Sequence, residues 1–413
     1  FMLKKKKFLL ISIITLFLFI IFFTILNKNK IYEVFFRYFF KLPDPVKSLY
    51  MISSGKRSFS NLFNDYNVKF LPETQLIKID FKRKKLNIKQ KRSRNSFYLE
   101  NFENEVFIIT KKGSFFKSNI DNFNNKNKKL NYSLIKTNVK FKNILDTLII
   151  KNKIFVSTTH SNNECKTLKI YFADIDKELN FSIFKKFLEC GKTSLGSGRM
   201  QKYLFNGDEG ILISTSDSFQ DEPDNRPQED SSIFGKILFI NLETRKHIIF
   251  SKGHRDLQGL YVKDNLIIST EHGPRGGDEI NIISFKGNYG WPIASYGNSY
   301  NSKKNKRKYL KSHIENGFIE PIHVFVPSIG ISEIIILPNN FEEKWKNNAL
   351  VASLNDRSIY RVKFQSDKFN KILYLEKIFI GERIRDIKYI EKINAIIIAL
   401  ERTGDIGVLK KID

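Results

Sequence analysis

The sequence predicts an all-β fold, a six-bladed β-propeller preceded by one N-terminal transmembrane helix. Three observations lead to this prediction: an apolar run close to the N-terminus, a pair of short β-branched strands that recurs six times, and the lack of a long amphipathic helix pattern after the apolar run. The chain has 413 residues, of which 41% are hydrophobic and 14% aromatic, so it can bury a sizeable core.

The apolar run Phe8–Leu26 is long enough to cross a membrane. At about 1.5 Å per residue a helix of this length spans roughly 28 Å, close to the thickness of a hydrocarbon core. Lys4–Lys7 precede the run, and no small-residue cleavage site follows it. We therefore expect a basic cytoplasmic tail (1–7), an uncleaved single-pass anchor (8–26) in the inner membrane and a juxtamembrane linker (27–74). The propeller (75–413) would lie on the periplasmic, exported side.

The repeat consists of an aliphatic run that ends in small or polar residues, a turn, and a second apolar strand. The central runs are Phe107–Thr110, Ile154–Thr159, Ile211–Ser216, Leu266–Glu271, Leu350–Asn355 and Ile396–Glu401. The strands that follow them are Gly113–Ser118, Leu168–Ile175, Gly235–Leu242, Asp278–Ser284, Arg357–Phe364 and Gly404–Lys410. An insertion, Phe285–Ile329, lengthens the fourth unit. Small sheets with two apolar faces bury both only by packing radially, which favours a propeller over an array of β-sandwiches.

The formal net charge of +27 first suggests nucleic-acid binding. The basic residues, however, cluster in Lys82–Arg94, Asn124–Lys129 and Lys303–Lys308, which we interpret as polar loops rather than as a groove-reading element. We therefore predict no nucleic-acid partner. Solvated loops and an anionic partner, such as a membrane surface or an acidic polysaccharide, remain as alternatives.

The two cysteines, Cys165 and Cys190, are an even pair in a domain that we expect to be exported. One disulfide is consistent with that compartment, and two buried thiols are the alternative. A zinc site is not expected, because the pair has no further ligands at zinc-binding spacing.

The stretch Gly253–Pro292 combines glycine, proline, tryptophan, arginine and histidine with two adjacent carboxylates, Asp278 and Glu279. Glycine allows close backbone approach, and carbonyl and carboxylate oxygens are the ligands that calcium prefers. The chemistry therefore suits a calcium site, although a long structured turn between strands would use the same residue types.

Together with the repeat, the motifs Gly253–Leu260, Glu271–Asn281 and Gly287–Pro292 resemble the glucose/sorbosone dehydrogenases. The resemblance covers Asn138–Lys411 and extends more weakly back to Gln75. It implies a six-bladed propeller that binds pyrroloquinoline quinone (PQQ) and calcium and oxidises an aldose at C1.

The resemblance also implies roles for individual residues. The backbone carbonyls of Gly273 and Pro274 stand where the cofactor-side calcium is bound. Glu279 and the backbone of Tyr289 stand where a second, structural calcium is held.

Cofactor binding is implied for a second group of positions. Arg383 and Arg385 match the family's arginines, and a planar guanidinium is a suitable donor to the carboxylates of PQQ. Asp256 and Gly273 complete the cofactor-binding set.

Several positions depart from the family pattern. The catalytic histidine is replaced by Leu195, which cannot accept a proton. Asp256 replaces an asparagine, Asn355 replaces a lysine, and the glutamine-bearing glycine-rich loop has no clear counterpart around Lys140–Leu145. His272 is a weak substitute for the missing base.

Two functions are therefore weighed. The first is a membrane-anchored, exported sugar dehydrogenase that uses PQQ and calcium. The second is a non-catalytic propeller that binds a carbohydrate, either a small sugar or a polysaccharide, or a protein partner. The replacement at Leu195 leaves the enzymatic status open.

Overall fold

The computed structural model describes residues 77–86, 95–162, 165–191, 196–217, 225–299, 308–366 and 368–412. All of them belong to the compact unit Val68–Asp413. The expected anchor, Phe8–Leu26, lies outside these residues. In the ranges that the structure describes, no helix is long and apolar enough to cross a membrane.

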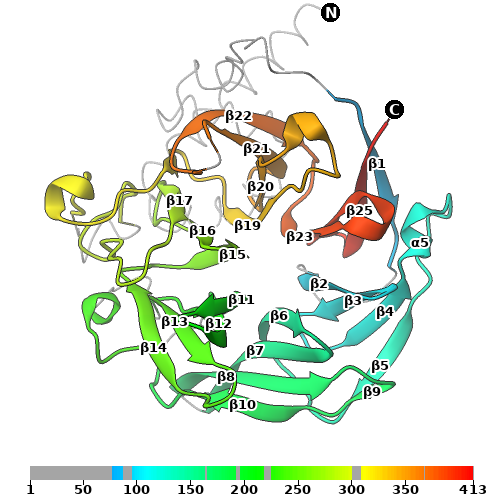
Figure 1. The fold of residues 1–413 in the computed structure, drawn as a ribbon, viewed down its shortest axis with the longest axis horizontal. Coiled ribbons are helices and arrows are strands. Elements are labelled where there is room, and N and C mark those ends of the chain that lie inside the picture. The colour runs from blue at the N-terminus through cyan, green and yellow to red at the C-terminus, as the bar shows by residue number, and fades with distance from the viewer. Residues whose placement is uncertain are drawn as a thin grey trace, which may run out of the picture. The chain divides into compact units, whose positions relative to one another are not determined.

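Six antiparallel sheets surround a common centre in this unit (Figure 1). Blade 1 contains β2 (Phe97–Phe102), β3 (Glu105–Thr110), β4 (Phe115–Asn119) and β5 (Ser133–Thr137), with β9 (Glu178–Leu179) added in parallel at its edge. Blade 2 contains β6 (Ile144–Ile150), β7 (Lys153–Asn162), β8 (Cys165–Asp174) and β10 (Ser182–Lys186). Blade 3 contains β11 (Met200–Phe205), β12 (Asp208–Ser214), β13 (Lys236–Asn241) and β14 (His247–Lys252).

The second half of the ring has the same organisation. Blade 4 contains β15 (Leu257–Lys263), β16 (Leu266–Glu271), β17 (Asp278–Ile282) and β18 (His323–Phe325). Blade 5 contains β19 (Ile331–Ile336), β20 (Ala349–Ser353), β21 (Ser358–Phe364) and β22 (Ile372–Phe379). Blade 6 contains β23 (Ile384–Ile390), β24 (Ala395–Leu400), β25 (Asp405–Lys411) and β1 (Ile79–Lys84).

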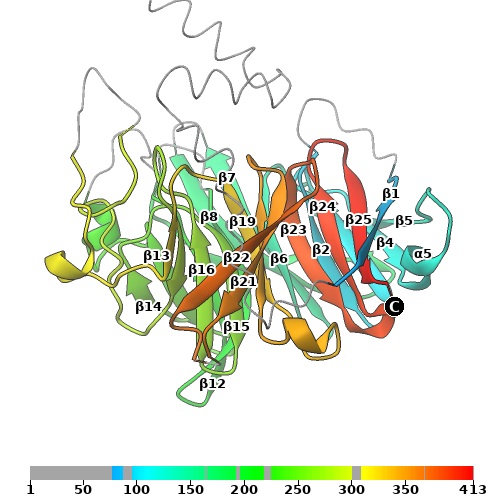
Figure 2. The ribbon, with the colours of Figure 1, turned by 90° about the horizontal axis from the view of Figure 1, so that it is seen from above.

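The predicted six-bladed propeller is thus confirmed. Each predicted central run coincides with the second strand of a blade, and each predicted following strand with the third. The insertion of the fourth unit carries the outermost strand of blade 4, β18, at its far end. Figure 2 shows the blades from the side.

Strand β1 closes the ring, because it pairs with β25 in the last blade although it comes first in the chain. This corrects the interpretation of Lys82–Arg94 as a loop, since Lys82–Lys84 belong to the strand; residues 87–94 lie outside the described ranges. An edge strand is held by backbone hydrogen bonds to one neighbour and can form without alternating apolar residues. The charged sequence of β1 therefore lacked the alternation by which a strand is recognised. Lys84 is 1% exposed and donates to Asn125 O, Asn125 Oδ1 and Asn127 O at 2.7, 2.9 and 2.8 Å.

The core is divided among the boundaries between neighbouring blades. Buried apolar side chains form a separate cluster at each boundary, as between blades 5 and 6, where Leu350 and Ile359 pack with Ile396 and Ile398. The second strands are apolar on both faces because each blade is covered on both sides. This explains the continuous aliphatic runs in the sequence.

Little helix interrupts the strands. In the described residues the α-helical segment is α5 (Asp121–Asn124), and the 3₁₀ turns are η1 (Arg226–Gln228), η2 (Ile314–Asn316), η3 (Glu343–Trp345) and η4 (Glu391–Ile393).

Cys165 and Cys190 form a disulfide with a Cα–Cα distance of 5.2 Å, which confirms the predicted pairing. The bond joins the start of β8 to the loop that leaves β10. The adjacent residues Lys166 and Gly191 also pair through their backbones, with N–O distances of 3.0 and 2.9 Å. The disulfide and this backbone pair therefore hold Cys190 and Gly191 against the start of β8.

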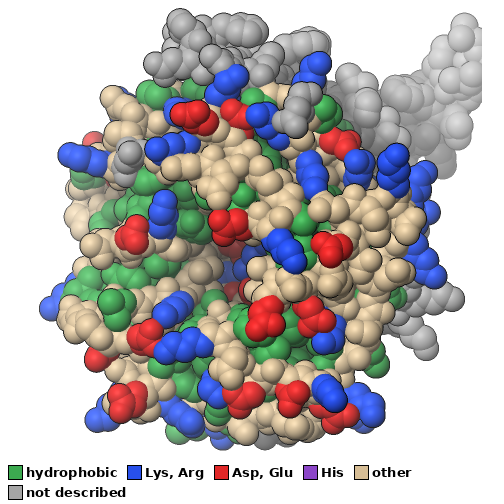
Figure 3. All heavy atoms as spheres, turned by 45° about the vertical axis from the view of Figure 1, so that its right-hand side comes forward, with side chains coloured by type: hydrophobic (Ala, Val, Ile, Leu, Met, Phe, Trp, Pro, Cys, Tyr) green, Lys and Arg blue, Asp and Glu red, His purple; other side chains and the backbone are tan. Residues whose placement is uncertain are grey.

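A buried ionic network connects the innermost strands. Arg199, immediately before β11, contacts Asp146 of β6 at 3.0 Å and Glu333 of β19 at 2.9 Å, and donates to Gln258 O of β15 at 2.6 Å. Backbone N–H groups of adjacent strands complete it: Leu99 donates to Asp386, Met200 to Asp146 and Leu260 to Glu333. Figure 3 shows a face that is hollowed near its centre, with basic and acidic side chains in the hollow.

Candidate functional site

The predicted site residues lie at one end of the innermost strands and their neighbours. Asp256 immediately precedes β15, and His272, Gly273 and Pro274 follow β16. Arg383 and Arg385 flank the first residue of β23, while Glu279 lies in β17 and Tyr289 in the loop that follows it. We call this end of the propeller the mouth.

The two arginines share one buried carboxylate. Arg383 Nε lies 2.6 Å from Glu401 Oε2, and Arg385 Nη2 lies 2.9 Å from Glu401 Oε1. Ser96 Oγ donates to the same carboxylate. The side chain of Glu401 is 1% exposed, and its pKa is lowered because the charges of Arg385 and Arg383 outweigh the effect of burial. The arginines therefore belong to an internal cluster and not to surface ion pairs.

Gln258 links this cluster to Asp256. Its side chain accepts from Arg385 Nη1 at 3.1 Å and donates to Asp256 Oδ1 at 2.8 Å. Gln258 lies in β15 with its side chain toward the mouth. The structure therefore joins Arg383, Arg385 and Asp256 in one hydrogen-bonded chain.

Asp256 forms an ion pair with His272, with 3.5 Å between Oδ2 and Nδ1. Burial opposes ionisation of Asp256, but the hydrogen bond and charge of His272 prevail, so the pKa of Asp256 is lowered. The pKa of His272 is raised: burial opposes the imidazolium, whereas Asp256 and Asp278 favour it. Asp256 replaces the asparagine of the family pattern, and the structure pairs the anion that this replacement adds with a histidine.

The turn after His272 brings several carbonyl groups close together. A Cβ atom on Gly273 would lie 2.1 Å from Gly277 O and 2.4 Å from Gly276 O, so a larger residue would not fit. The N–H of Gly273 donates to Asp278 Oδ1 at 3.2 Å. This crowded oxygen-rich turn contains the two carbonyls, those of Gly273 and Pro274, to which the family resemblance assigned calcium.

A small cavity lies beside this turn. It is lined by Arg255, Glu271, His272, Gly273, Glu279, Tyr289, Trp291, Ala294, Ser295 and His313. Glu279 is 8% exposed, so its carboxylate is buried and not solvated. His313 Nε2 lies 3.9 Å from Glu279, and its Nδ1 is buried without a hydrogen-bond partner among the described residues.

The electrostatics of this cavity favour a cation. Burial raises the pKa of Glu279 well above its usual range, and the neighbouring Glu271 raises it further. Asn281 Nδ2, at 3.3 Å, is a weak partner for this carboxylate. A buried carboxyl group beside a second one is ionised at neutral pH only when a positive charge compensates it.

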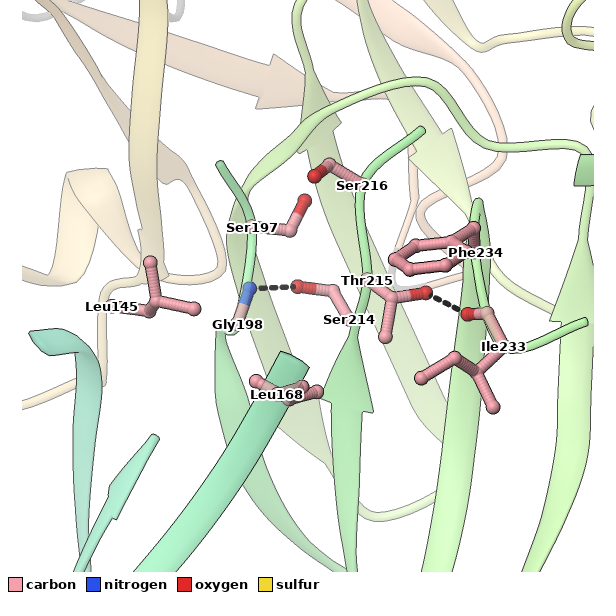
Figure 4. A pocket seen from close by; sticks show the side chains of 9 residues that line it. All are labelled: Leu145, Leu168, Ser197, Gly198, Ser214, Thr215, Ser216, Ile233 and Phe234. Carbon is pink, nitrogen blue, oxygen red and sulfur yellow. Dashed lines mark hydrogen bonds between the residues drawn. The ribbon is translucent and has the colours of Figure 1, made fainter. Parts of the chain in front are cut away.

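Leu195, the position of the family's base, lies outside the described residues, which resume at Gly196. Gly196 lies against the mouth, since a Cβ atom there would be 2.6 Å from Asp256 Oδ1. A small cavity lies between blades 2 and 3, with Leu145 and Leu168 on one side and Ile233 and Phe234 on the other, and Ser197, Ser214, Thr215 and Ser216 also line it (Figure 4).

Sequence reasoning missed several residues of the mouth. The recognised motifs contain or adjoin three of them, Glu401, Gln258 and Glu271. The spacing of these residues along the sequence does not indicate which residues they contact. His313, interpreted as an ordinary loop residue, reaches the cavity from the insertion. Lys111 comes from blade 1, outside every motif that the resemblance covers.

A comparison with protein families matches residues 150–407 to the model described as glucose/sorbosone dehydrogenase, more than half of the chain. The chain belongs to the glucose/sorbosone dehydrogenase family. The Escherichia coli aldose sugar dehydrogenase YliI is 26% identical over 234 residues, which cover 52% of this chain and 60% of YliI. The match spans about three fifths of the length of the curated relatives.

Solved structures of aldose sugar dehydrogenases share the fold. The soluble enzyme from Escherichia coli in its apo form has a TM-score of 0.66 and 18% identity, covering 81% of this chain and 99% of that one. The PQQ-bound enzyme from Streptomyces coelicolor has a TM-score of 0.57 and 14% identity, covering 82% and 99%. At these identities the likeness concerns the fold, and the roles of individual residues remain predictions.

Proposed function

We propose that this member of the glucose/sorbosone dehydrogenase family binds PQQ and calcium at its mouth and oxidises an aldose at C1. The observation that carries the proposal is the continuous chain of contacts from Arg383 and Arg385 through Gln258 to Asp256 and His272. It brings together cofactor-binding positions that the resemblance assigned separately, beside a cavity with two buried glutamates.

The residues present fit both groups. Arg383 and Arg385 lie side by side on Glu401, and a planar guanidinium with five N–H donors matches the carboxylates of a quinone. Burial and then Glu271 raise the pKa of Glu279, so a bound cation would favour the ionised form of this carboxylate. The carbonyls of the Gly273–Gly277 turn add oxygen ligands of the kind that calcium prefers.

In this proposal Arg383 and Arg385 orient the cofactor, and Asp256 holds His272 through Nδ1. When bound, PQQ supplies the acceptor for the hydride from C1, and calcium polarises it. The His272 side chain is 24% exposed, and its Nε2 is buried without a hydrogen-bond partner among the described residues. We therefore expect His272, in its neutral form with the Nδ1 proton directed to Asp256, to take the hydroxyl proton at Nε2 in place of the family's histidine.

We further propose that the propeller is exported and held at the membrane by Phe8–Leu26. The supporting observations are the length of that apolar run and the Cys165–Cys190 disulfide, since disulfides persist mainly in oxidising compartments. Labelling of the cysteines after reduction in intact spheroplasts tests this arrangement. Protection of both thiols from a membrane-impermeant reagent would place the propeller inside the cell.

A second candidate function is favoured by Leu195. Without the family's base the mouth can retain a ligand and lose turnover, leaving a propeller that binds a carbohydrate or a protein partner.

One experiment separates the two functions. The full chain, purified in detergent, is titrated with PQQ in the presence of calcium chloride, and dye reduction is followed with a panel of aldoses. Binding with turnover supports the dehydrogenase, and binding without turnover supports the non-catalytic propeller. If PQQ does not bind at micromolar concentration, the cofactor assignment is wrong.

A further inference from the structure

Two lysines occupy the middle of one β-turn at the mouth. Lys111 and Lys112 lie between Thr110 and Gly113, whose N–H donates to Thr110 O at 2.9 Å. Gly113 has a φ of +89°, and a Cβ atom there would lie 2.6 Å from Phe141 Cβ, so the turn is fixed by sterics. The fixed turn leaves Lys112 exposed and Lys111 partly buried.

The backbone of Lys111 is attached on both sides. Its N–H donates to Ser96 O at 2.9 Å, and its carbonyl accepts from Ile144 N at 2.8 Å. Ser96 in turn donates through Oγ to Glu401, the carboxylate shared by Arg383 and Arg385. The turn therefore places Lys111 next to the arginine cluster.

The charge of Lys111 is not balanced locally. In the described part of the chain its ammonium group has no ion-pair or hydrogen-bond partner, whereas the arginines engage Glu401. Burial lowers the pKa of Lys111, and Arg385 lowers it further, while Glu401 and Asp256 act in the opposite direction. Those two carboxylates are already bonded to Arg385 and His272, respectively. A partly buried cation in this setting gains stability from an added anion.

We propose that Lys111 binds a carboxylate group of the ligand at the mouth. The proposal rests on the proposed function for its first ligand, PQQ, and the same carboxylate chemistry is offered by the substrate if that is a uronic acid. Lys111 would then restore, from blade 1, the positive charge that the family pattern loses at Asn355 in blade 5. Both positions lie at the mouth ends of their blades, Lys111 after β3 and Asn355 after β20.

The neighbouring lysine of the turn, Lys112, provides a matched control. Lys111→Gln and Lys112→Gln remove the same charge from adjacent residues of the full chain, and Lys111→Arg retains it. Calorimetric titration with PQQ and calcium should show affinity at least 10-fold weaker for Lys111→Gln, and within about twofold of wild type for Lys112→Gln and Lys111→Arg. Thermal melting of each variant shows that it is folded.

A second titration distinguishes the source of the carboxylate. Glucuronate and glucose are titrated into the protein without PQQ. Loss of glucuronate binding in Lys111→Gln, with glucose unaffected, assigns Lys111 to the substrate carboxylate; loss of PQQ binding assigns it to the cofactor.

The inference is overturned if Lys111→Gln and Lys112→Gln bind PQQ with equal affinity and also bind glucuronate with equal affinity. That result leaves PQQ binding by the wild type intact. If the wild type binds no PQQ, the proposed function fails, and the glucuronate titration alone decides on Lys111; absence of binding there also overturns the inference.

Discussion

Leucine at position 195 is the single replacement with the largest chemical consequence. The neighbouring Gly196 lies against Asp256 of the mouth. A leucine side chain has no group that can accept a proton. The neighbouring His272, held by Asp256, is the group that the structure offers instead.

Restoring the family's residue should therefore restore general-base catalysis. We expect Leu195→His to raise dye-reduction turnover with an aldose by roughly 10²–10⁴-fold, the usual contribution of a positioned base. PQQ affinity should remain within a few-fold of wild type. His272→Gln should reduce the residual turnover of the wild type and have a smaller effect in Leu195→His. No gain of turnover in Leu195→His, despite normal PQQ binding, would argue that more than the base has been lost.

At this scale the sequence predicted residues but not their partners. The glycine-rich motifs indicated Gly273 and Glu279, because local spacing preserves a turn and its ligands, and the match to the family's arginines indicated Arg385. The contact of Arg385 with Gln258 joins residues 127 positions apart, and such pairs follow from ring closure and not from any local pattern. Lys111 was missed for the same reason.

The elements around the Glu279 cavity illustrate how an insertion completes a site. β17 contributes Glu279, and the insertion that follows it folds back to contribute Trp291, Ser295 and His313. Cation binding should therefore fix the insertion as well as neutralise the glutamates.

Calcium should raise the melting temperature of the wild type by mass action. In Glu279→Gln this rise should be lost, whereas the calcium-free variant should be more stable than wild type at neutral pH, because the amide has no buried acid group to ionise. Glu315→Gln, an exposed position on η2, is the matched control. If calcium raises the melting temperature of Glu279→Gln as much as that of the wild type, the ion binds at another site.

Strand β1 shows where sequence prediction failed at the scale of an element. The sequence Lys82-Arg83-Lys84 resembles a solvated loop, yet it pairs with β25, and Lys84 reaches the loop after α5 in blade 1. One lysine thus connects the closing strand of blade 6 to the first blade.

Removing the ammonium group of Lys84 should weaken that connection. Lys84→Met removes the donor of three part-buried hydrogen bonds to Asn125 and Asn127, and we expect a loss of roughly 1–3 kcal/mol in the free energy of unfolding. Lys82→Met, on the same strand and exposed, should cost less than about 1 kcal/mol although it ends a contact with Asp80. Urea denaturation monitored by tryptophan fluorescence measures both. If both substitutions lower the free energy of unfolding by the same amount, Lys84 contributes no more to stability than a surface lysine.

For the molecule as a whole, the six-blade architecture was predictable because the amino-acid sequence contains a sixfold repeat of apolar strands. The ionic network at its centre was not, since each acid stands alone in its own blade and its partners are in others. The network contains Glu100, Asp146, Glu333 and Asp386 with Arg199 and Lys388. Four carboxyl groups against two cations leave an excess of buried acid.

This excess should make stability depend on pH. Burial raises the pKa of Glu100 to about 8 and that of Glu333 to about 7, each against an opposing cation, Lys388 and Arg199, respectively. Both folded-state values lie above the ordinary glutamate pKa of about 4.3. The folded protein therefore holds more protons than the unfolded chain between about pH 4 and 8, and these two groups lower stability as pH rises through that window.

Glu100→Gln should flatten the decline, because the amide cannot lose a proton. Its melting temperature should exceed that of the wild type at pH 8 and approach it at pH 5, because the charges of Asp386 and Asp146 still favour the Lys388 ammonium group in the variant. Glu243→Gln, exposed on the turn after β13, should follow the wild-type profile. Melting temperatures between pH 5 and 9 provide the measurement. A wild-type profile that stays flat or rises from pH 5 to 8 would mean that the central acids are ionised and compensated, as by a cation bound within the ring.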